Sequence, residues 1–249
     1  MRRWRAPWSA SIQAPPGSAM NGFLREKSVR TGVVRSASAA RPSLVNVAHR
    51  EEDPADGYAE PRPLPPGQHR AQTWRPNHYG RVPRIDLASW SLTVSGATAD
   101  HADRTLSWAD LEPLPRIEVV ADHHCVSRST VQDVRWGGIP CGAVLDLAEP
   151  ADEARYAIPY GSYGYSSIIT IDDLLSPRSI FATHLDGEPL PAEHGWPMRL
   201  VVPHLYGWKG PKWLIALEFC VEPRRGFWEQ RGYHFTGDVW REERYAHQE

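Results

Sequence analysis

The sequence predicts an α+β domain: a mixed β-sheet with short helices. Segments with strand-like alternation are short and are interspersed with capped helical turns, and no segment has the periodicity of a long helix. The regular strand–helix–strand order of a doubly wound parallel sheet does not occur. We therefore expect short strands and short helices packed in one domain, which ends in an irregular, aromatic-rich tail over residues 226–245.

The first 63 residues are predicted to lie outside this domain. Ala, Arg, Ser, Pro and Glu dominate them, and the proline-rich segment EEDPADGYAEPRPLPPG closes the region. Such a composition buries too little apolar surface to offset the entropy lost on ordering. We expect a disordered leader and linker over residues 1–63 and the folded domain over residues 64–249.

Two strands and one short helix are predicted in the first part of the domain. Apolar side chains alternate along SWSLTVSG (residues 89–96), which ends in a glycine turn. Ser107 and Asp110 have the spacing of a capping box, and a proline three residues later limits this helix to one or two turns. RIEVVADHHC (residues 116–125) predicts the second strand.

The rest of the domain shows the same alternation of short elements. A Gly-Gly pair (residues 137–138) predicts a turn followed by a helix, and Thr170 begins another short capped helix. An Asp-Gly pair (residues 186–187) between apolar runs predicts a tight hairpin. MRLVVP (residues 198–203) and KWLIALEFCVE (residues 212–222) are well-bounded predicted strands.

The composition argues against several classes of protein. A net charge of −2 does not fit a general nucleic-acid binder. No stretch approaches the roughly 20 apolar residues that span a bilayer. The three cysteines are odd in number and far apart, which argues against a disulfide framework. Because no apolar run follows the N-terminal arginines, we expect a cytoplasmic protein without a signal peptide.

Cys125, in ADHHCVSRST (residues 121–130), is the most informative single residue. Side chains alternate along a strand, so His123 and Cys125 should share a face while His124 points away. Zinc needs three or four ligands, and no CxxC, HxxxH or HExxH occurs, so zinc is weakly supported. A buried inert cysteine, a nucleophile with a nearby base, and a thiolate favoured by Arg128 stay open.

Three loops combine cations with glycine or proline: WRPNHYGRVP, EHGWPMRLVVP and YGWKGPKWL. Ammonium groups and exposed N–H groups around a Gly-Pro turn make a plausible cradle for a phosphate. Each loop alone is typical of ordinary surface, but together with Cys125 they indicate a large anionic cofactor with a metal at its reactive end. The polar side chains of these loops are Arg75, Asn77, His78, Arg81, His194, Arg199, Lys209 and Lys212.

In this order, these stretches resemble the molybdopterin-binding domain of the sulfite oxidase family. The resemblance is closest to the short stand-alone bacterial sulfite-oxidase-like oxidoreductases, and it covers about three quarters of the chain, from Leu64 onward. DHHCVSRSTVQDVRWGGIP is similar to the family's block in which a cysteine ligates molybdenum. LDGEPLPAEHGWPMRLVVPHLYGWKGPKWL is the most specific match, and PNHYGRVPRIDLASWSLTVSG and GFWEQRGYHFTGDVWREERY resemble the opening and closing blocks.

The resemblance implies one molybdopterin (Mo-molybdopterin) with Cys125 as the protein's thiolate ligand to the metal. It implies Tyr163 and Tyr165 on the substrate side, and Arg128 as a contact for an anionic substrate or a group that tunes the thiolate. The cofactor contacts that it implies are Asn77, His78, His124, Cys125, His194, Arg199, Lys209 and Lys212.

The activity implied is oxygen-atom transfer of the sulfite oxidase type. The substrate would be a small oxyanion, a sulfoxide or a related molecule, and electrons would pass to or from a separate partner protein. Three positions depart from the family pattern: Ser129 replaces a tryptophan, Gly210 replaces a serine of the phosphate loop, and Ile168 replaces an asparagine. A degenerate protein that binds cofactor without activity, and a Cys/His-dependent metallohydrolase, are the alternatives.

Overall fold

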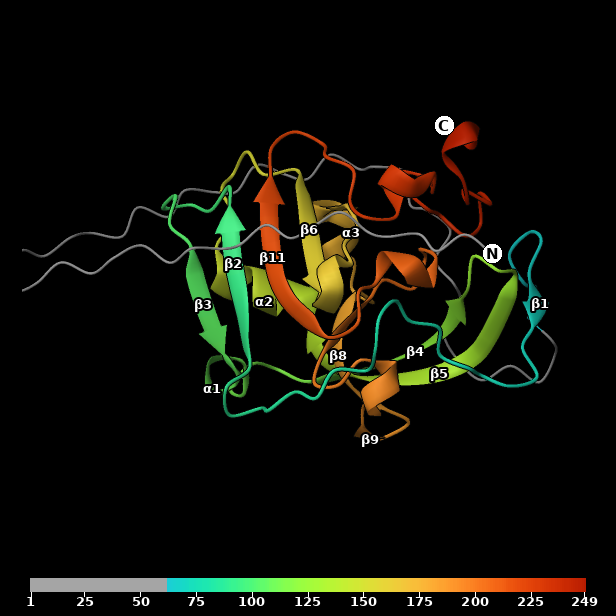
Figure 1. Ribbon diagram of the computed structural model, residues 1–249, viewed down its shortest axis with the longest axis horizontal. Helices are drawn as coiled ribbons and strands as arrows, with labels where there is room; N and C mark the ends of the chain where they lie inside the picture. The colour runs from blue at the N-terminus through green and yellow to red at the C-terminus, as the bar shows by residue number, and fades with distance from the viewer. Residues whose placement is uncertain (1–61) are drawn as a thin grey trace, which may run out of the picture. The chain divides into compact units, whose positions relative to one another are not determined.

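The computed structural model describes residues 62–249, which form two β-sheets with short helices (Figure 1). The leader predicted over residues 1–63 therefore lies, apart from its last two residues, outside the described part. None of the helices in residues 62–249 combines the length and the apolar character that a bilayer crossing requires.

The first sheet has six strands and carries the segments that surround the functional site. β5 runs antiparallel to β4 and β8, β8 pairs with β10 and β9, and β1 pairs with β5 in parallel. The strands are β1 (His69–Arg70), β4 (Ile117–His124), β5 (Ser129–Pro140), β8 (Ile180–Leu185), β9 (Glu188–Pro189) and β10 (Arg199–Val201).

The second sheet has five strands in the order β3-β2-β11-β6-β7. Its central strand β11 is parallel to β2 and antiparallel to β6, so the domain mixes both kinds of pairing, as an α+β fold allows. The strands are β2 (Ser91–Gly96), β3 (Arg104–Ser107), β6 (Tyr156–Gly161), β7 (Ile169–Thr170) and β11 (Leu214–Cys220).

The helices are short, as predicted. Ser107 and Asp110 form the capping box of α1 (Trp108–Leu111), and Thr170 caps α3 (Ile171–Leu174). The longest helix is α2 (Cys141–Ala148). Single 3-10 turns are η1 (Ser162–Gly164), η2 (Ala192–His194), η3 (Gly207–Lys209), η4 (Glu229–Arg231) and η5 (Ala246–Gln248); the last two lie in the tail predicted to be irregular.

The predicted turn at Gly137 and Gly138 is wrong, because β5 continues through both residues to Pro140. The pairing register of β5 with β8 shifts between the two glycines. A Cβ atom at Gly138 would lie 2.2 Å from the backbone oxygen of Phe181, so this glycine permits close strand contact and not a chain reversal.

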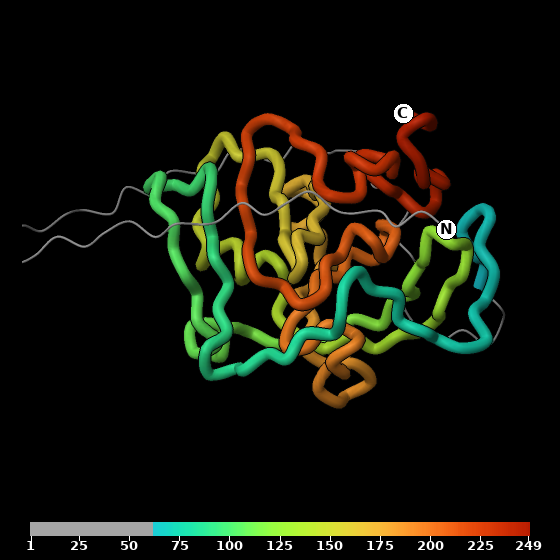
Figure 2. The backbone as a smooth tube through the Cα atoms, viewed as in Figure 1, coloured from blue at the N-terminus to red at the C-terminus, as the bar shows by residue number. Residues whose placement is uncertain are grey.

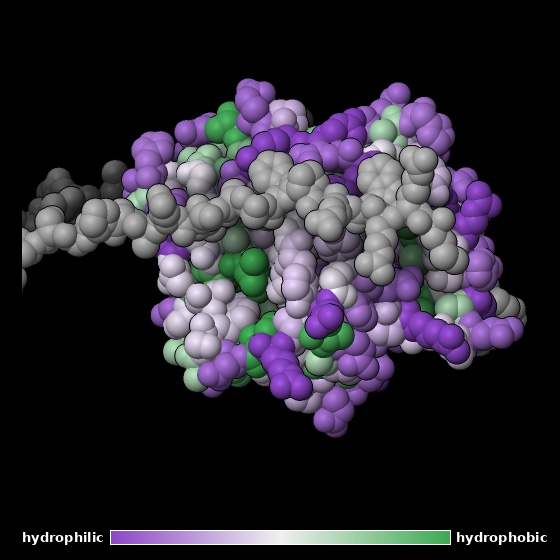
Figure 3. Space-filling view, viewed as in Figure 1, coloured by the Kyte–Doolittle hydropathy of each residue, from purple (hydrophilic) through white to green (hydrophobic). Residues whose placement is uncertain are grey.

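The main hydrophobic core joins both sheets and α2. It includes Leu92 and Leu217 from the second sheet, Phe181 and Leu200 from the first, and Val144 from α2. On the face shown in Figure 3, hydrophobic colour appears in separate patches among pale and hydrophilic residues. The two sheets are thus held rigidly against each other, and loops from both can build one site.

Residues 71–89 contain no helix or strand and connect β1 to β2 across the molecule (Figure 2). This crossover segment holds the first of the three cationic loops. Aromatic contacts, and not the hydrogen bonds of a β-sheet, position this segment. The ring centroids of Trp74 and His194 lie 4.4 Å apart, and those of His78 and Trp213 lie 5.5 Å apart.

Candidate active site

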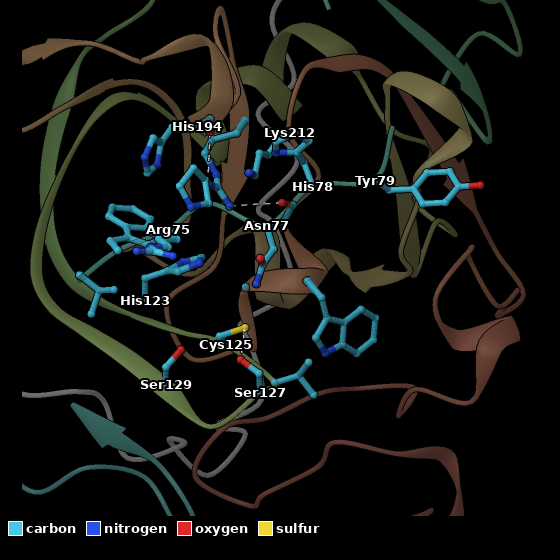
Figure 4. A pocket seen from close by; sticks show the side chains of 18 of the residues that line it. Arg75, Asn77, His78, Tyr79, His123, Cys125, Ser127, Ser129, His194 and Lys212 are labelled. Carbon is cyan, nitrogen blue, oxygen red and sulfur yellow. Dashed lines mark hydrogen bonds between the residues drawn. The ribbon is translucent and has the colours of Figure 1, made fainter. Parts of the chain in front are cut away.

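A cavity of about 580 Å³ lies where the crossover segment, the β4–β5 turn, η2, η3 and the C-terminal tail meet. The cavity is lined by Asn77, His78, Cys125, Tyr165, His194, Arg199 and Lys212, although Asn77 and Lys212 are more than 130 residues apart in the sequence. The structure therefore brings most of the predicted site residues together (Figure 4).

Cys125 lies at the tight turn that joins β4 to β5. Its backbone N donates to the oxygen of Ser129 at 2.8 Å, and its oxygen accepts from the backbone N of Arg128 at 3.0 Å. The hydroxyl of Ser127 donates to Cys125 Sγ at 3.0 Å. The half-buried sulfur thus faces the cavity from a backbone that hydrogen bonds hold in place.

The strand geometry separates the two neighbouring histidines, as the sequence predicts. His123 lines the cavity with Cys125, whereas His124 is buried elsewhere, with its Nδ1 2.9 Å from Thr130 Oγ1. Burial lowers the pKa of His124 to about 4 and holds the pKa of His123 well below its usual value. Both rings are therefore neutral near pH 7.

Arg199, Lys212 and Arg75 form a cationic side of the cavity, which His194 also lines. Burial, and next the charge of Arg199, lowers the pKa of Lys212 to about 7 and that of His194 to about 4. Burial lowers the pKa of Arg199 itself to about 10, and this residue is only 2% exposed. Arg199 and Lys212 thus lie close together although they carry like charges. An anionic ligand would remove the electrostatic cost of this arrangement.

Two buried polar atoms on this side have no hydrogen-bond partner among the described residues: His194 Nδ1 and Arg199 Nε. The other nitrogens of Arg199 donate to backbone oxygens of His194 and Gly210 at 3.3 and 3.5 Å, and Lys212 Nζ donates to the oxygen of Glu193 at 2.8 Å. Unpaired buried N–H groups are costly, so the site fits a ligand that carries several acceptor oxygens, as a phosphate does.

Four predicted site residues do not line the cavity. Tyr163 is half exposed in η1, with positive φ, and its ring packs on Gly80, whereas Tyr165, predicted with it, lines the cavity. Arg128, also at positive φ, is exposed in the β4–β5 turn and is not among the residues that line the cavity. His124 faces away for the reason given above.

Lys209 is the fourth, and the structure gives it a different role. It is 1% exposed and donates to Glu229 Oε1 at 2.7 Å and to the oxygen of Phe235 at 2.6 Å. Burial lowers its pKa, while Glu229 partly offsets that effect. The lysine therefore ties η3 to the C-terminal tail instead of reaching the cavity.

The sequence reasoning missed several lining residues, of which His123, Trp74 and Trp228 are the most prominent. His123 could have been included, because a spacing of two residues from Cys125 in a strand places both on one face. Trp74 and Trp228 gave no such signal, since each lies in a segment without regular periodicity.

No group of three or more His, Cys, Asp or Glu side chains within residues 62–249 could hold a metal ion. A structural zinc centre made of protein ligands is thus without support in this part of the chain. Cys125 remains as a single soft sulfur donor that lines the same cavity as Arg199 and Lys212. This arrangement is compatible with a metal held on an anionic cofactor.

The family described as "Oxidoreductase molybdopterin binding domain" matches residues 79–228, and the chain belongs to this family. The protein is therefore a molybdopterin-dependent oxidoreductase of the sulfite oxidase type, and Mo-molybdopterin is its cofactor.

Three relatives illustrate the match. The chain is 38% identical over 184 residues to an uncharacterized oxidoreductase, YuiH, of Bacillus subtilis (strain 168), covering 74% of this chain and 92% of that protein. It is 29% identical to the catalytic subunit MsrP of a protein-methionine-sulfoxide reductase from Xanthomonas campestris, covering 58% of this chain and 49% of MsrP. It is 28% identical to sulfite oxidase of Arabidopsis thaliana, covering 64% of this chain and 49% of that enzyme.

The chain thus spans nearly all of the first relative but about half of the other two. Among solved structures, the sulfane dehydrogenase SoxCD of Paracoccus pantotrophus aligns with a TM-score of 0.53 at 20% identity, covering 58% of this chain and 41% of that chain. This likeness shows a shared fold.

Proposed function

We propose that the protein transfers an oxygen atom to or from a small oxyanion, sulfoxide or related substrate and exchanges electrons with a separate partner protein. When bound, the molybdenum cofactor supplies the two-electron redox change and the centre at which oxygen is transferred. The observation that carries the proposal is a thiol that lines the same cavity as the cations Arg199 and Lys212, with unpaired buried nitrogens on Arg199 and His194. MsrP and sulfite oxidase, two relatives, support the two directions of transfer.

The residues have separate parts in this proposal. Cys125 Sγ would ligate the metal, and the hydroxyl of Ser127, which donates to this sulfur, would help to hold it in position. His194, Arg199 and Lys212 would bind the phosphate, while Asn77, His78 and Tyr165 lie on the remaining lining. Oxidation of an oxyanion takes oxygen from water and releases two electrons and two protons; reduction of a sulfoxide takes them up and releases water. We place this activity in the cytoplasm.

Metal analysis tests the proposal directly. Protein from a host that makes molybdopterin should contain about one molybdenum atom and one pterin, the latter detected by its fluorescence after oxidation. A folded protein without molybdenum would contradict the proposal. Stoichiometric molybdenum without turnover of sulfite, sulfoxides or N-oxides would instead favour a cofactor-binding protein that has lost activity.

Replacing Lys212 with alanine is expected to lower cofactor occupancy without unfolding the domain. A charge-assisted hydrogen bond to phosphate contributes about 1.5–3 kcal/mol, which corresponds to roughly 10- to 100-fold in affinity. Pterin and molybdenum per protein chain measure the loss. Arg81→Ala, which removes an exposed cation outside the lining, is the matched control. Equal occupancy in Lys212→Ala and wild type would remove this lysine from the binding site.

Anion binding to the cofactor-free protein should weaken as the pH rises above about 7. The pKa of Lys212 is lowered to about 7, so its ammonium form is complete below that pH and is lost above it. Sulfate keeps one charge state over this range, and its affinity should fall by up to about tenfold per pH unit above pH 7. Calorimetric titration between pH 6 and 9 measures the slope, which should be absent in Lys212→Met. A slope that persists in this variant would assign the titration to another group.

A further inference from the structure

The turn between β4 and β5, which carries Cys125, is held by two side chains from distant segments of the chain. Gln68 lies just before β1, and Arg244 lies in the C-terminal tail. Figure 1 shows β1 and the tail at the end of the domain where β4 and β5 meet. Both side chains contact the backbone of the turn, and neither lines the cavity.

Arg244 is buried, with an exposed fraction of 2%, and its guanidinium group is fixed on several sides. Nη1 donates to the backbone oxygen of Val126 at 2.6 Å, and Nη2 donates to that of Pro66 at 3.3 Å. Nε pairs with Glu242 Oε1 at 3.3 Å, and the group lies 4.8 Å from the ring centroid of Tyr206. A rigid, planar set of donors therefore holds the middle of the turn.

Gln68 holds the neighbouring carbonyl group of the same turn. Its Nε2 donates to the backbone oxygen of Cys125 at 3.2 Å, and its Oε1 accepts from Thr130 Oγ1 at 3.1 Å. The Thr130 hydroxyl also lies 2.9 Å from Nδ1 of the buried His124. The amide of Gln68 thus bridges the start of the turn and β5, the strand that follows it.

Two consecutive carbonyl groups, those of Cys125 and Val126, are therefore anchored by side chains. Each belongs to a planar peptide unit, so an anchored oxygen fixes the orientation of its plane. The second plane includes the backbone N of Ser127, whose hydroxyl donates to Cys125 Sγ at 3.0 Å. The direction in which the sulfur faces the cavity thus depends on donors that lie outside the cavity.

We infer that Arg244 and Gln68 are positioning residues for the metal ligand: they hold the turn so that Cys125 Sγ meets the metal in one fixed geometry. The inference rests on the proposed function for the part that Cys125 has as the ligand. Replacing an outer residue that orients a metal ligand typically lowers activity about 10- to 100-fold. An arginine that only fastened the tail would affect stability and leave the turn unchanged.

Hydrogen exchange of the full-length chain tests the inference without turnover. The backbone N–H groups of Cys125 and Arg128, which close the turn by hydrogen bonds, report its local opening. Arg244→Met should speed their exchange about 10- to 100-fold, which is the contribution of one charge-assisted hydrogen bond. The amides of α2 should keep their wild-type exchange rates.

Two further variants complete this experiment. Arg225→Met is the matched control, because Arg225 also donates to backbone oxygens of the tail but does not contact the turn. It should leave the exchange of the turn unchanged. Gln68→Met removes one neutral donor and should speed that exchange about 2- to 10-fold. If Arg244→Met does not fold, Gln68→Met decides the test.

In the molybdenum-loaded protein, Arg244→Met should lower kcat about 10- to 100-fold, while KM and pterin content stay near wild type because the cavity lining is intact. The electron paramagnetic resonance signal of the half-reduced metal should broaden, since the metal–sulfur geometry is no longer uniform. Arg244→Lys, which keeps a cationic donor near the oxygen of Val126, should recover part of both losses.

Unchanged exchange of the turn in Arg244→Met and Gln68→Met would overturn the inference. Faster exchange across the whole domain in Gln68→Met would also overturn it, as would a wild-type kcat in a variant whose turn exchanges faster. A wild-type protein without molybdenum would instead count against the proposed function, because the exchange experiment does not require the metal.

Discussion

Replacing Cys125 with serine is expected to abolish oxygen-atom transfer while the domain stays folded. Serine presents a hard, protonated oxygen where a soft thiolate would ligate molybdenum. Changes to residues that merely support a metal ligand cost about 10- to 100-fold, so loss of the ligand itself should cost more than about 100-fold. Steady-state turnover, together with molybdenum and pterin content, measures the effect.

The fold should tolerate this change because the sulfur is half-buried at a turn held by backbone hydrogen bonds. Cys220→Ser is the matched control, since Cys220 is also half-buried but does not line the cavity. It should retain wild-type activity. Activity retained in Cys125→Ser, at a thermal stability equal to wild type, would remove Cys125 from the mechanism.

Replacing Lys209 with methionine is expected to produce the largest loss of stability. Glu229 is fully buried and its Oε1 accepts from both Lys209 and the backbone N of Ile168. Removing the lysine leaves a buried carboxylate without its counter-ion, which typically costs about 3–5 kcal/mol. Urea denaturation of the cofactor-free protein measures the change in the free energy of unfolding.

Two further variants separate this structural role from the cofactor contact implied by the family resemblance. Lys209→Met combined with Glu229→Gln should recover part of the lost stability, because the uncompensated charge is gone. Lys212→Met should leave the free energy of unfolding near that of wild type. A Lys209→Met protein of wild-type stability that binds no pterin would restore Lys209 to the binding site.

Sequence patterns predicted most local elements correctly, for identifiable reasons. The strand at Ser91–Gly96, the caps at Ser107 and Thr170 and the hairpin at Asp186–Gly187 each depend on residues close together in the chain. β5 was missed, because its Gly-Gly pair has the signature of a turn, whereas its close pairing with β8 depends on Phe181, more than 40 residues later.

The candidate site was predicted in part. The separation of His123 from His124 followed from strand alternation, and the role of Cys125 came from the family resemblance. The aromatic lining by Tyr79 and Trp228 could not be foreseen, since both lie in segments whose spacing carries no period. Their rings meet only because the crossover segment and the tail pack over the same cavity.

By itself, the sequence determined the class of fold, the thiol at the end of a strand and the set of cations that an anionic cofactor needs. The tertiary structure decided which of these cations line the cavity. Lys209 and Lys212 are three residues apart on one loop, yet the first turns inward to Glu229 and the second lines the cavity. The physical reason is that a buried ammonium group needs a counter-ion. Glu229, 20 residues after Lys209, provides this carboxylate because the C-terminal tail folds back over η3.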